Sequence, residues 1–406
     1  MKKIAVRLRW SPQDILDVGE LAEVDRRIYF EFNAAFMGRG LSLSPFKLPL
    51  RAGLIEHTDR SYGPLPGMLD DSLPDGWGRL LMDRMFRKRG IEPATVSPLD
   101  RLSCVGTHGM GALTFHPPAE DNEAGQRLLD LHKIGENARA VLAGETTAVL
   151  PELMRAGGSA AGARPKVLVG VRGHQIVSGE DDLPDGFEHW IIKFSARANA
   201  RNAGPIEYAY AAMARAAGID IPETRLFCVG KNASYFGVRR FDRTPGNQRL
   251  HVHTLANLVH ANFRIPSMDY ADLLKVTLAL TRSHADVMRA FRWMVFNIGA
   301  HNRDDHAKNF AFIMNSLGEW TLSPAYDLTH STGPGGEHTM TVAGEGRSPT
   351  RAEVLKLAKQ AEVSPKDATA ILDQVNAATA GWDTLANEAG VSKTQSRAIA
   401  KTFVRL

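Results

Sequence analysis

The segment from His301 to Phe310, which reads His-Asn-Arg-Asp-Asp-His-Ala-Lys-Asn-Phe, constrains this chain more than any other stretch. Residues 285–300, directly before it, carry apolar side chains at the spacing of an amphipathic helix. Residues 310–314 are typical of a strand. The pattern therefore predicts a helix-to-strand turn that holds Asp304 and Asn309 five residues apart.

This separation is the one that phosphoryl transfer requires of a catalytic turn. A carboxylate orients and deprotonates the attacking hydroxyl, and an amide oxygen five residues later helps to hold Mg²⁺. A predicted hairpin with its turn at 315–318 then returns a second acid, Asp327, to the same place. Because Mg²⁺ prefers oxygen ligands and usually takes only one or two carboxylates, Asp327 is the candidate main metal carboxylate.

Three upstream features fit the same chemistry. Lys193 lies between bulky apolar residues in a predicted strand at 188–194, where a charge is costly unless it meets an anion such as an ATP phosphate. Glu207, near the start of a predicted helix at 206–217, is a candidate partner for Lys193. The small residues from Gly157 to Gly162 would let backbone amides approach phosphates.

Each of these signals also has an ordinary structural explanation. A glycine-rich loop is more often only a loop, a strand lysine usually reaches to water, and an aspartate in a turn is usually a cap. His306 is better explained as a brace for the turn than as an acid or base. The order of the features is more specific, because glycine loop, strand lysine, helix glutamate, Asp-x4-Asn and second Asp follow the order of a kinase.

Composition narrows the remaining classes. The chain has 406 residues, 44% of them hydrophobic, so two or three cores are expected. The net charge of +4 is spread without dense basic runs, so direct nucleic-acid binding is not indicated. Cys104 and Cys228 form no C-x-x-C pair, which favours a reducing compartment. No uncharged run approaches the roughly eighteen residues of a membrane span, so we expect a cytoplasmic protein.

The chain divides into three predicted parts. Residues 1–115 combine a small sheet with a helix near 77–86, and residues 116–123 are a polar, proline-rich linker. Residues 125–255 contain a helical stretch and then the glycine-rich loop, with strands at 166–171, 188–194, 224–229 and 234–241. Residues 256–406 are mainly helical, and the glycine-rich stretch at 333–346 is expected to be mobile. The fold class expected from this pattern is α+β.

Several separate stretches resemble the HipA family of bacterial toxin kinases. In the N-terminal part, Leu65 to Gly78 (Leu-Pro-Gly-Met-Leu-Asp-Asp-Ser-Leu-Pro-Asp-Gly-Trp-Gly) is similar to a signature of that family. In the kinase part, the similar stretches are Gly157 to Lys166, Ile191 to Lys193, Phe241 to Arg243, Asp304 to Asn309, and Tyr326 with Asp327.

The resemblance implies a two-lobed, protein-kinase-like fold related to phosphoinositide kinases, with an N-terminal α/β subdomain and Ser/Thr protein kinase activity. It makes Asp304 the catalytic base, Asn309 and Asp327 the Mg²⁺ ligands, and Lys193 the lysine on the ATP phosphates. The other expected nucleotide contacts are Gly157, Gly158, Ala160, Ala161, Gly162, the hinge-like Arg239 and Phe241, and His306 and Lys308. Ser159 would be autophosphorylated, which inactivates the enzyme in this family.

The resemblance also implies partners. Substrates in the family include aminoacyl-tRNA synthetases, especially the glutamyl enzyme. The chain would act as the toxin of a bacterial type II toxin–antitoxin pair. The expected neutralising partner is a small helix-turn-helix, HipB-like antitoxin, so that any DNA association would be indirect.

Three alternatives to a protein kinase remain. Asp304, His306 and Asn309 also fit the catalytic turn of a lipid or small-molecule kinase. A catalytically silent protein that docks an antitoxin would keep the fold, although intact Lys193 and Asp327 argue against it. A metal hydrolase would need a zinc motif, and the spacing of His251, His253 and His260 fits none.

Overall fold

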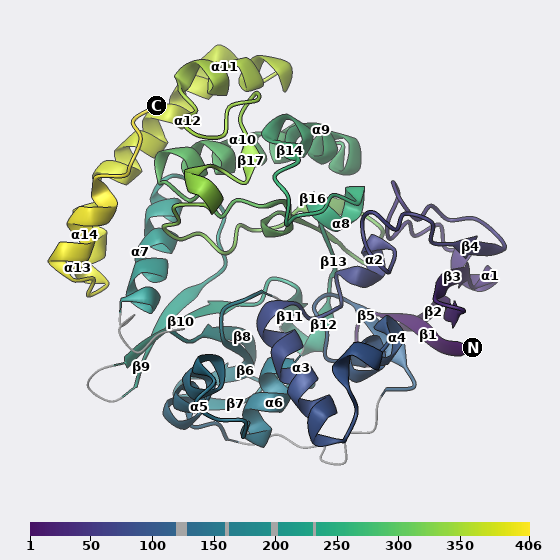
Figure 1. Ribbon diagram of the computed structural model, residues 1–406. Helices are drawn as coiled ribbons and strands as arrows, with labels where there is room; N and C mark the ends of the chain where they lie inside the picture. Colours follow the sequence, from purple (N-terminus) through teal and green to yellow (C-terminus); the bar gives the residue numbers. More distant parts are fainter. Residues whose placement is uncertain (119–127, 159–161, 196–201, 230–232) are drawn as a thin grey trace.

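A computed structural model describes residues 1–118, 128–158, 162–195, 202–229 and 233–406. Three parts surround a common centre: an N-terminal subdomain, a second sheet with its own helices, and a helical lobe that includes the C-terminus (Figure 1). None of the helices in the described part is long and apolar enough to cross a membrane.

The N-terminal subdomain is built on an antiparallel sheet with the order β4-β3-β2-β1-β5. In β1, alternate residues Ile4, Val6 and Leu8 are buried, as a strand with one covered face requires. The strands are β1 Lys2–Arg9, β2 Ile15–Val24, β3 Arg27–Phe32, β4 Leu54–Glu56 and β5 Leu113–His116. The helices are α1 Ala34–Met37, α2 Gly67–Asp70, α3 Gly76–Lys88 and α4 Pro98–Val105, with a 3-10 turn at Pro93–Thr95.

The second sheet has the order β7-β6-β8-β10-β9 and is also antiparallel. Its strands are β6 Lys166–Arg172, β7 Gln175–Ser178, β8 Glu188–Lys193, β9 Thr224–Val229 and β10 Ala233–Arg239. Val167 and Ile192 pack into one core with helices α5 Leu131–Ala143 and α6 Pro151–Gly158. Because side chains alternate along a strand, Lys166 and Lys193 face the opposite side. Helix α7, Ala203–Ala216, packs beside β9 and β10.

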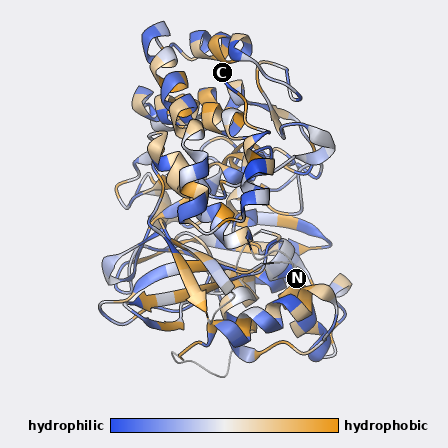
Figure 2. Cartoon of the chain, turned by 90° about the vertical axis from the view of Figure 1, so that its left-hand side faces the viewer, coloured by the Kyte–Doolittle hydropathy of each residue, from blue (hydrophilic) through white to orange (hydrophobic). Residues whose placement is uncertain are grey.

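The helical lobe has α10, His284–Gly299, at the centre of its core. Val287, Phe291 and Met294 of this helix are fully buried, which agrees with the amphipathic spacing seen in the sequence. The surrounding helices mix hydrophobic and hydrophilic residues along their length (Figure 2). They are α8 Leu255–Val259, α9 Tyr270–Thr281, α11 Arg351–Gln360, α12 Pro365–Ala380, α13 Trp382–Glu388 and α14 Lys393–Ala400.

Short strands connect this lobe to the rest of the molecule. Strand β13, His251–Thr254, pairs with β15, Ala311–Met314, which pairs with β16, Trp320–Leu322. The hairpin expected after residue 310 is therefore present. Two further pairs join β11 Arg243–Thr244 to β12 Gln248–Arg249, and β14 Met268–Asp269 to β17 Met340–Thr341. The remaining 3-10 turns lie at Pro245–Asn247, Ala307–Asn309 and Pro334–Gly336.

A fully buried carboxylate, Asp242, joins the N-terminal subdomain to the end of β10. It accepts hydrogen bonds from Arg240 and Arg243, both 2.7 Å from its Oδ2, and from the Gly111 amide at 2.7 Å. Both arginines also donate to the carbonyl oxygen of Gly109. Burial alone would raise the pKa of Asp242, but the two guanidinium groups outweigh it and hold the pKa well below its usual range.

We predict that Asp242→Asn lowers the free energy of unfolding by about 3–5 kcal/mol at neutral pH, because two buried guanidinium groups lose their counter-charge. The pKa of Asp242 is lower in the folded state than in the unfolded state. The contribution of Asp242 to wild-type stability is therefore fully present above about pH 4 and is lost as the pH falls below that value. Urea unfolding measured as a function of pH checks both effects.

The matched control is Asp17→Asn, because Asp17 pairs with Arg7 at 2.7 Å while its side chain is 64% exposed. An exposed pair contributes little to stability, so this variant is expected to unfold like wild type. Equal, small losses in both variants would contradict the role assigned to Asp242.

Candidate active site

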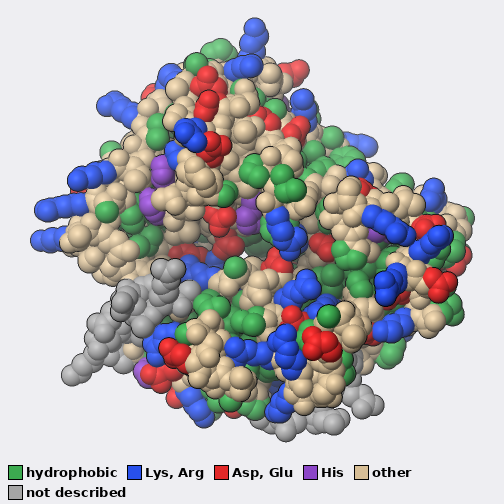
Figure 3. Space-filling view, viewed as in Figure 1, with side chains coloured by type: hydrophobic (Ala, Val, Ile, Leu, Met, Phe, Trp, Pro, Cys, Tyr) green, Lys and Arg blue, Asp and Glu red, His purple; other side chains and the backbone are tan. Residues whose placement is uncertain are grey.

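A cavity of about 580 Å³ lies where the three parts of the molecule meet. Its walls come from β6, β8 and β10, from the segment before α3, and from the turn that follows α10. Figure 3 shows acidic and basic side chains around a hollow between the upper lobe and the lower half. Lys193, Asp304, Asn309 and Asp327, predicted from separate parts of the sequence, all line this cavity.

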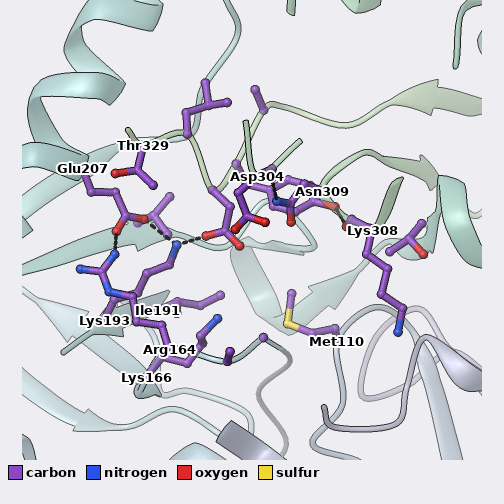
Figure 4. Close-up of a pocket in the computed structure, with 18 of the residues that line it drawn as sticks. Met110, Arg164, Lys166, Ile191, Lys193, Glu207, Asp304, Lys308, Asn309 and Thr329 are labelled. Carbon is purple, nitrogen blue, oxygen red and sulfur yellow. Dashed lines mark hydrogen bonds and ion pairs between the residues drawn. The ribbon is translucent and has the colours of Figure 1, made fainter. Parts of the chain in front are cut away.

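Lys193 is the centre of a buried charge network. Its Nζ lies 2.5 Å from Oε1 of Glu207 (Figure 4). The same Nζ also donates to Oδ1 of Asp327. Glu207 lies on α7 and receives a second cation, Arg164. The pairing of Lys193 with Glu207 that the sequence suggested is therefore confirmed.

The network fixes the charge states of its members. Burial opposes the charge on Lys193, but the carboxylates of Asp327 and Glu207 outweigh it and raise the pKa of the ammonium. Burial likewise opposes the charge on Asp327, yet Lys193 and Lys166 hold the pKa of that carboxyl well below its usual range. The Asp327 side chain is thus an ionised carboxylate whose oxygens can bind a cation inside the cavity.

The turn after α10 presents Asp304 and Asn309 to the same space. The Nδ2 of Asn309 donates to the backbone oxygen of Asp304 at 2.7 Å, so the amide oxygen is the atom left for a cation. Partial burial raises the pKa of the Asp304 carboxyl, and the neighbouring Asp327 adds to this effect. A raised pKa suits a group that accepts a proton during a reaction.

These oxygens fit a Mg²⁺ ion that is held in part by phosphates. Asp327 and Asn309 supply hard oxygen ligands, which Mg²⁺ prefers. In the described residues no group of three or more His, Cys, Asp or Glu side chains is placed to hold a metal.

The glycine-rich stretch differs from its expected form. Gly157 and Gly158 belong to the last turn of α6, and a Cβ on Gly157 would lie 2.8 Å from Leu81 and 3.0 Å from Trp77. Gly162 lines the cavity. Ser159, Ala160 and Ala161 lie outside the described residues, so the autophosphorylation expected of Ser159 and the nucleotide contacts expected of Ala160 and Ala161 stay predictions.

The N-terminal subdomain holds the end of this stretch at Gly162. The carboxylate of Asp75 accepts a hydrogen bond from the Gly162 amide, and the Trp77 amide donates to the Gly162 carbonyl at 3.0 Å. Gly76 between them has a φ of +42°, and a Cβ there would lie 2.5 Å from Cα of Ala163. Asp75 occupies the cap position of α3 but makes no side-chain cap bond, so its carboxylate serves Gly162 instead.

The other predicted residues have different surroundings. Arg239 and Phe241 line the cavity, but the Arg239 side chain is 47% exposed and lies 2.9 Å from Glu188. The His306 ring lies 5.4 Å from the Phe263 ring. Lys308 extends away from Asp304 (Figure 4). Its Nζ lies 3.5 Å and 3.8 Å from carboxylates of the N-terminal subdomain, Asp70 and Asp75.

Lys166 is a site residue that the sequence analysis did not single out. It lies directly opposite Lys193 in the pairing of β6 with β8, is 7% exposed, and lines the cavity. Burial lowers its pKa. The available signal was its place at the start of a strand with the same alternation as the strand of Lys193.

Comparison with known proteins identifies the family. A model described as HipA-like C-terminal domain matches residues 158–382, and one described as HipA N-terminal domain matches residues 14–116. The chain belongs to the HipA family. The resemblance drawn from separate motifs is thereby confirmed.

Two relatives of this HipA-family chain are informative. "Putative kinase Y4dM" of Sinorhizobium fredii is 30% identical over 196 residues, or 44% of this chain, and the match spans about half (47%) of that protein. The HipA chain solved in the "Shewanella oneidensis MR-1 Toxin Antitoxin System HipA, HipB and its operator DNA complex" superimposes with a TM-score of 0.71 at 17% identity. It covers 98% of this chain and 94% of that one, which confirms the expected kinase-like α+β fold.

Proposed function

We propose that this HipA-family protein is an ATP- and Mg²⁺-dependent protein kinase that phosphorylates Ser or Thr and acts as the toxin of a toxin–antitoxin pair. The observation that carries the proposal is the convergence of Lys193, Asp304, Asn309 and Asp327 on one cavity. A lysine with a helix glutamate, a base and two metal ligands are the parts that kinases use for phosphoryl transfer.

Each residue has a distinct task in this proposal. Lys193, kept charged by Glu207 and Asp327, binds phosphate oxygens, and Lys166 beside it offers a second cation. Asp327 and Asn309 hold Mg²⁺, which when bound neutralises charge that develops on the phosphates. Asp304 orients the acceptor hydroxyl and takes its proton. The apolar walls from Leu168, Ile191 and Val238 suit a purine ring.

Regulation through Ser159 belongs to the same proposal. Ser159 precedes Gly162 by three residues, and Gly162 is bonded to the Asp75 carboxylate. A phosphate on Ser159 would add up to two negative charges to the glycine-rich stretch and would repel the phosphates of ATP. Autophosphorylation there would consequently switch the enzyme off.

The proposed partners follow from the family. The Shewanella HipA structure is a complex with HipB and operator DNA, which supports a HipB-like helix-turn-helix antitoxin as partner, with DNA bound indirectly. We propose an aminoacyl-tRNA synthetase as the substrate and the cytoplasm as the place of action. A transferred phosphate on such a synthetase would arrest translation.

Labelled ATP and Mg²⁺ are expected to label the wild-type chain on Ser159. Asp304→Asn is expected to lose the label because the base is absent, and Ser159→Ala is expected to keep activity toward other acceptors while its own label disappears. Mass spectrometry locates the phosphate. A wild-type chain that is free of phosphate beforehand and neither binds ATP nor takes up label would refute the kinase proposal.

Lys193→Met is expected to weaken Mg²⁺–ATP binding by roughly 10- to 100-fold, since a buried charge-assisted bond to phosphate is lost. Calorimetric titration measures the affinity. Arg239→Met is the control, because the Arg239 side chain pairs with Glu188 at the cavity rim and any adenine contact there is expected from the backbone. Similar losses in both variants would show that Lys193 has no special role.

A further inference from the structure

The glycine-rich segment, residues 331–347, is bound on both sides of the proposed base. The sequence suggested that its glycine-rich part, residues 333–346, is mobile. In the structure, Arg303 and Asp305, the two neighbours of Asp304, both direct their side chains into the segment. Asp304 itself has a side chain that is 59% exposed, and its nearest ion-pair contact is His306 at 3.9 Å.

Arg303 donates hydrogen bonds to backbone oxygens of the segment. Its guanidinium donates to the carbonyl oxygen of Gly336, and a second nitrogen donates to the carbonyl oxygen of Arg347 at 2.8 Å. The hydroxyl of Thr339 donates in return to the carbonyl oxygen of Arg303 at 3.0 Å. Backbone contact is also close, because a Cβ on Gly333 would lie 2.7 Å from Cβ of Arg303.

Asp305 anchors the segment from the other side of the base. This carboxylate is 1% exposed and accepts from the Thr339 amide at 2.7 Å, while Nδ1 of His338 lies 2.7 Å from its Oδ2. The Tyr270 hydroxyl donates to the same oxygen at 2.7 Å and accepts from Asn297 of α10 at 2.9 Å. The segment is therefore connected to the core of the helical lobe.

A third anchor lies further along the segment. Asp269, at the end of β14, accepts from the Thr341 hydroxyl at 2.7 Å and from the Gly344 amide at 2.8 Å. Strand β17 of the segment pairs in parallel with β14 at the same point. The middle and the later part of the segment are consequently bound without any added group.

We propose that Arg303 and Asp305 are positioning residues, which hold segment 331–347 preassembled beside the proposed base and thereby fix Asp304. The proposal rests on the proposed kinase function. Many protein kinases order the corresponding loop by phosphorylation, through new pairs between arginine and phosphate. Here the arginine beside the base already binds two carbonyl oxygens, so activity does not require a phosphate on the segment.

The geometry explains why the effect falls on Asp304. The backbone of residue 304 runs between two side chains that are both bonded to the segment, so a shift of the segment moves the base. A misplacement of about 1 Å can lower a rate by roughly 100-fold. Nucleotide binding depends on Lys193 and Asp327, which make no hydrogen bond to Arg303 or Asp305 among the described residues.

The test compares Arg303→Met, Arg303→Lys and the control Arg347→Met, with dephosphorylated casein as acceptor. Arg303→Met is expected to lower kcat by about 10- to 100-fold with the KM for ATP within about twofold of wild type. Arg303→Lys recovers part of the rate because an ammonium still reaches one carbonyl. Arg347→Met is expected to stay close to wild type, because Arg303 uses the backbone oxygen of Arg347, and the Arg347 side chain makes a surface ion pair with Glu337 while 70% exposed.

Two further readouts do not depend on turnover. Amide hydrogen exchange at residues 337–344 is expected to accelerate in Arg303→Met, with the thermal midpoint nearly unchanged. Mass spectrometry of the active wild type is expected to find no phosphate on Ser331, Thr332, Thr339 or Thr341. Activity confined to a fraction phosphorylated at one of these positions would overturn the proposal.

The outcomes separate this proposal from the kinase proposal. If wild type transfers phosphate and Arg303→Met matches it, the positioning role is wrong while the kinase function stands. A fall in kcat with an equal loss of ATP affinity and a lowered thermal midpoint would show general destabilisation and would also overturn it. If wild type binds ATP but transfers nothing to casein or to itself, the kinase function fails first.

Discussion

A carboxylate without contact to water, Asp242, sets the condition that the rest of this molecule satisfies. A buried anion requires compensating donors, and they come from Arg240 directly after β10, from Arg243 at the start of β11 and from the Gly111 amide of the N-terminal subdomain. The two parts therefore cannot separate without exposing three charges. Because the cavity has walls from both parts, its shape depends on this cluster.

Buried charges are also compensated by opposite charges in the cavity, but there the compensation is incomplete. Lys193 pairs with Glu207 and Asp327, and Arg164 pairs with Glu207. Lys166 lies beside them, in the field of both acids and of Asp75. The protein's own carboxylates keep the lysine ionised, yet they leave cationic capacity for another anion. The charges of the Asp242 cluster hold two parts of the molecule together, whereas the network around Lys193 leaves positive charge that can bind a ligand.

Short-range sequence patterns predicted the helices and strands well, whereas the long-range contacts could not be predicted from such patterns. The helix expected at 285–300 is α10, His284–Gly299, and the strand expected at 188–194 is β8, Glu188–Lys193, since both depend on local periodicity. The role of Asp75 was missed because its carboxylate meets Gly162, 87 residues away. Lys166 and the anchors of segment 331–347 were missed for the same reason: only the folded chain brings their partners together.

The hydrogen bonds of Asp75 and Trp77 to Gly162 cross the boundary between the two family domains. Sequence similarity divides the chain into an N-terminal and a C-terminal family domain, which suggests an accessory module placed before a self-sufficient catalytic unit. Asp75 and Trp77 of the first are bonded to Gly162 of the second, and Asp70 and Asp75 face its Lys308. The boundary between the two family domains therefore differs from the boundary of the site. A substitution in the N-terminal domain can change activity without altering any of the proposed catalytic side chains.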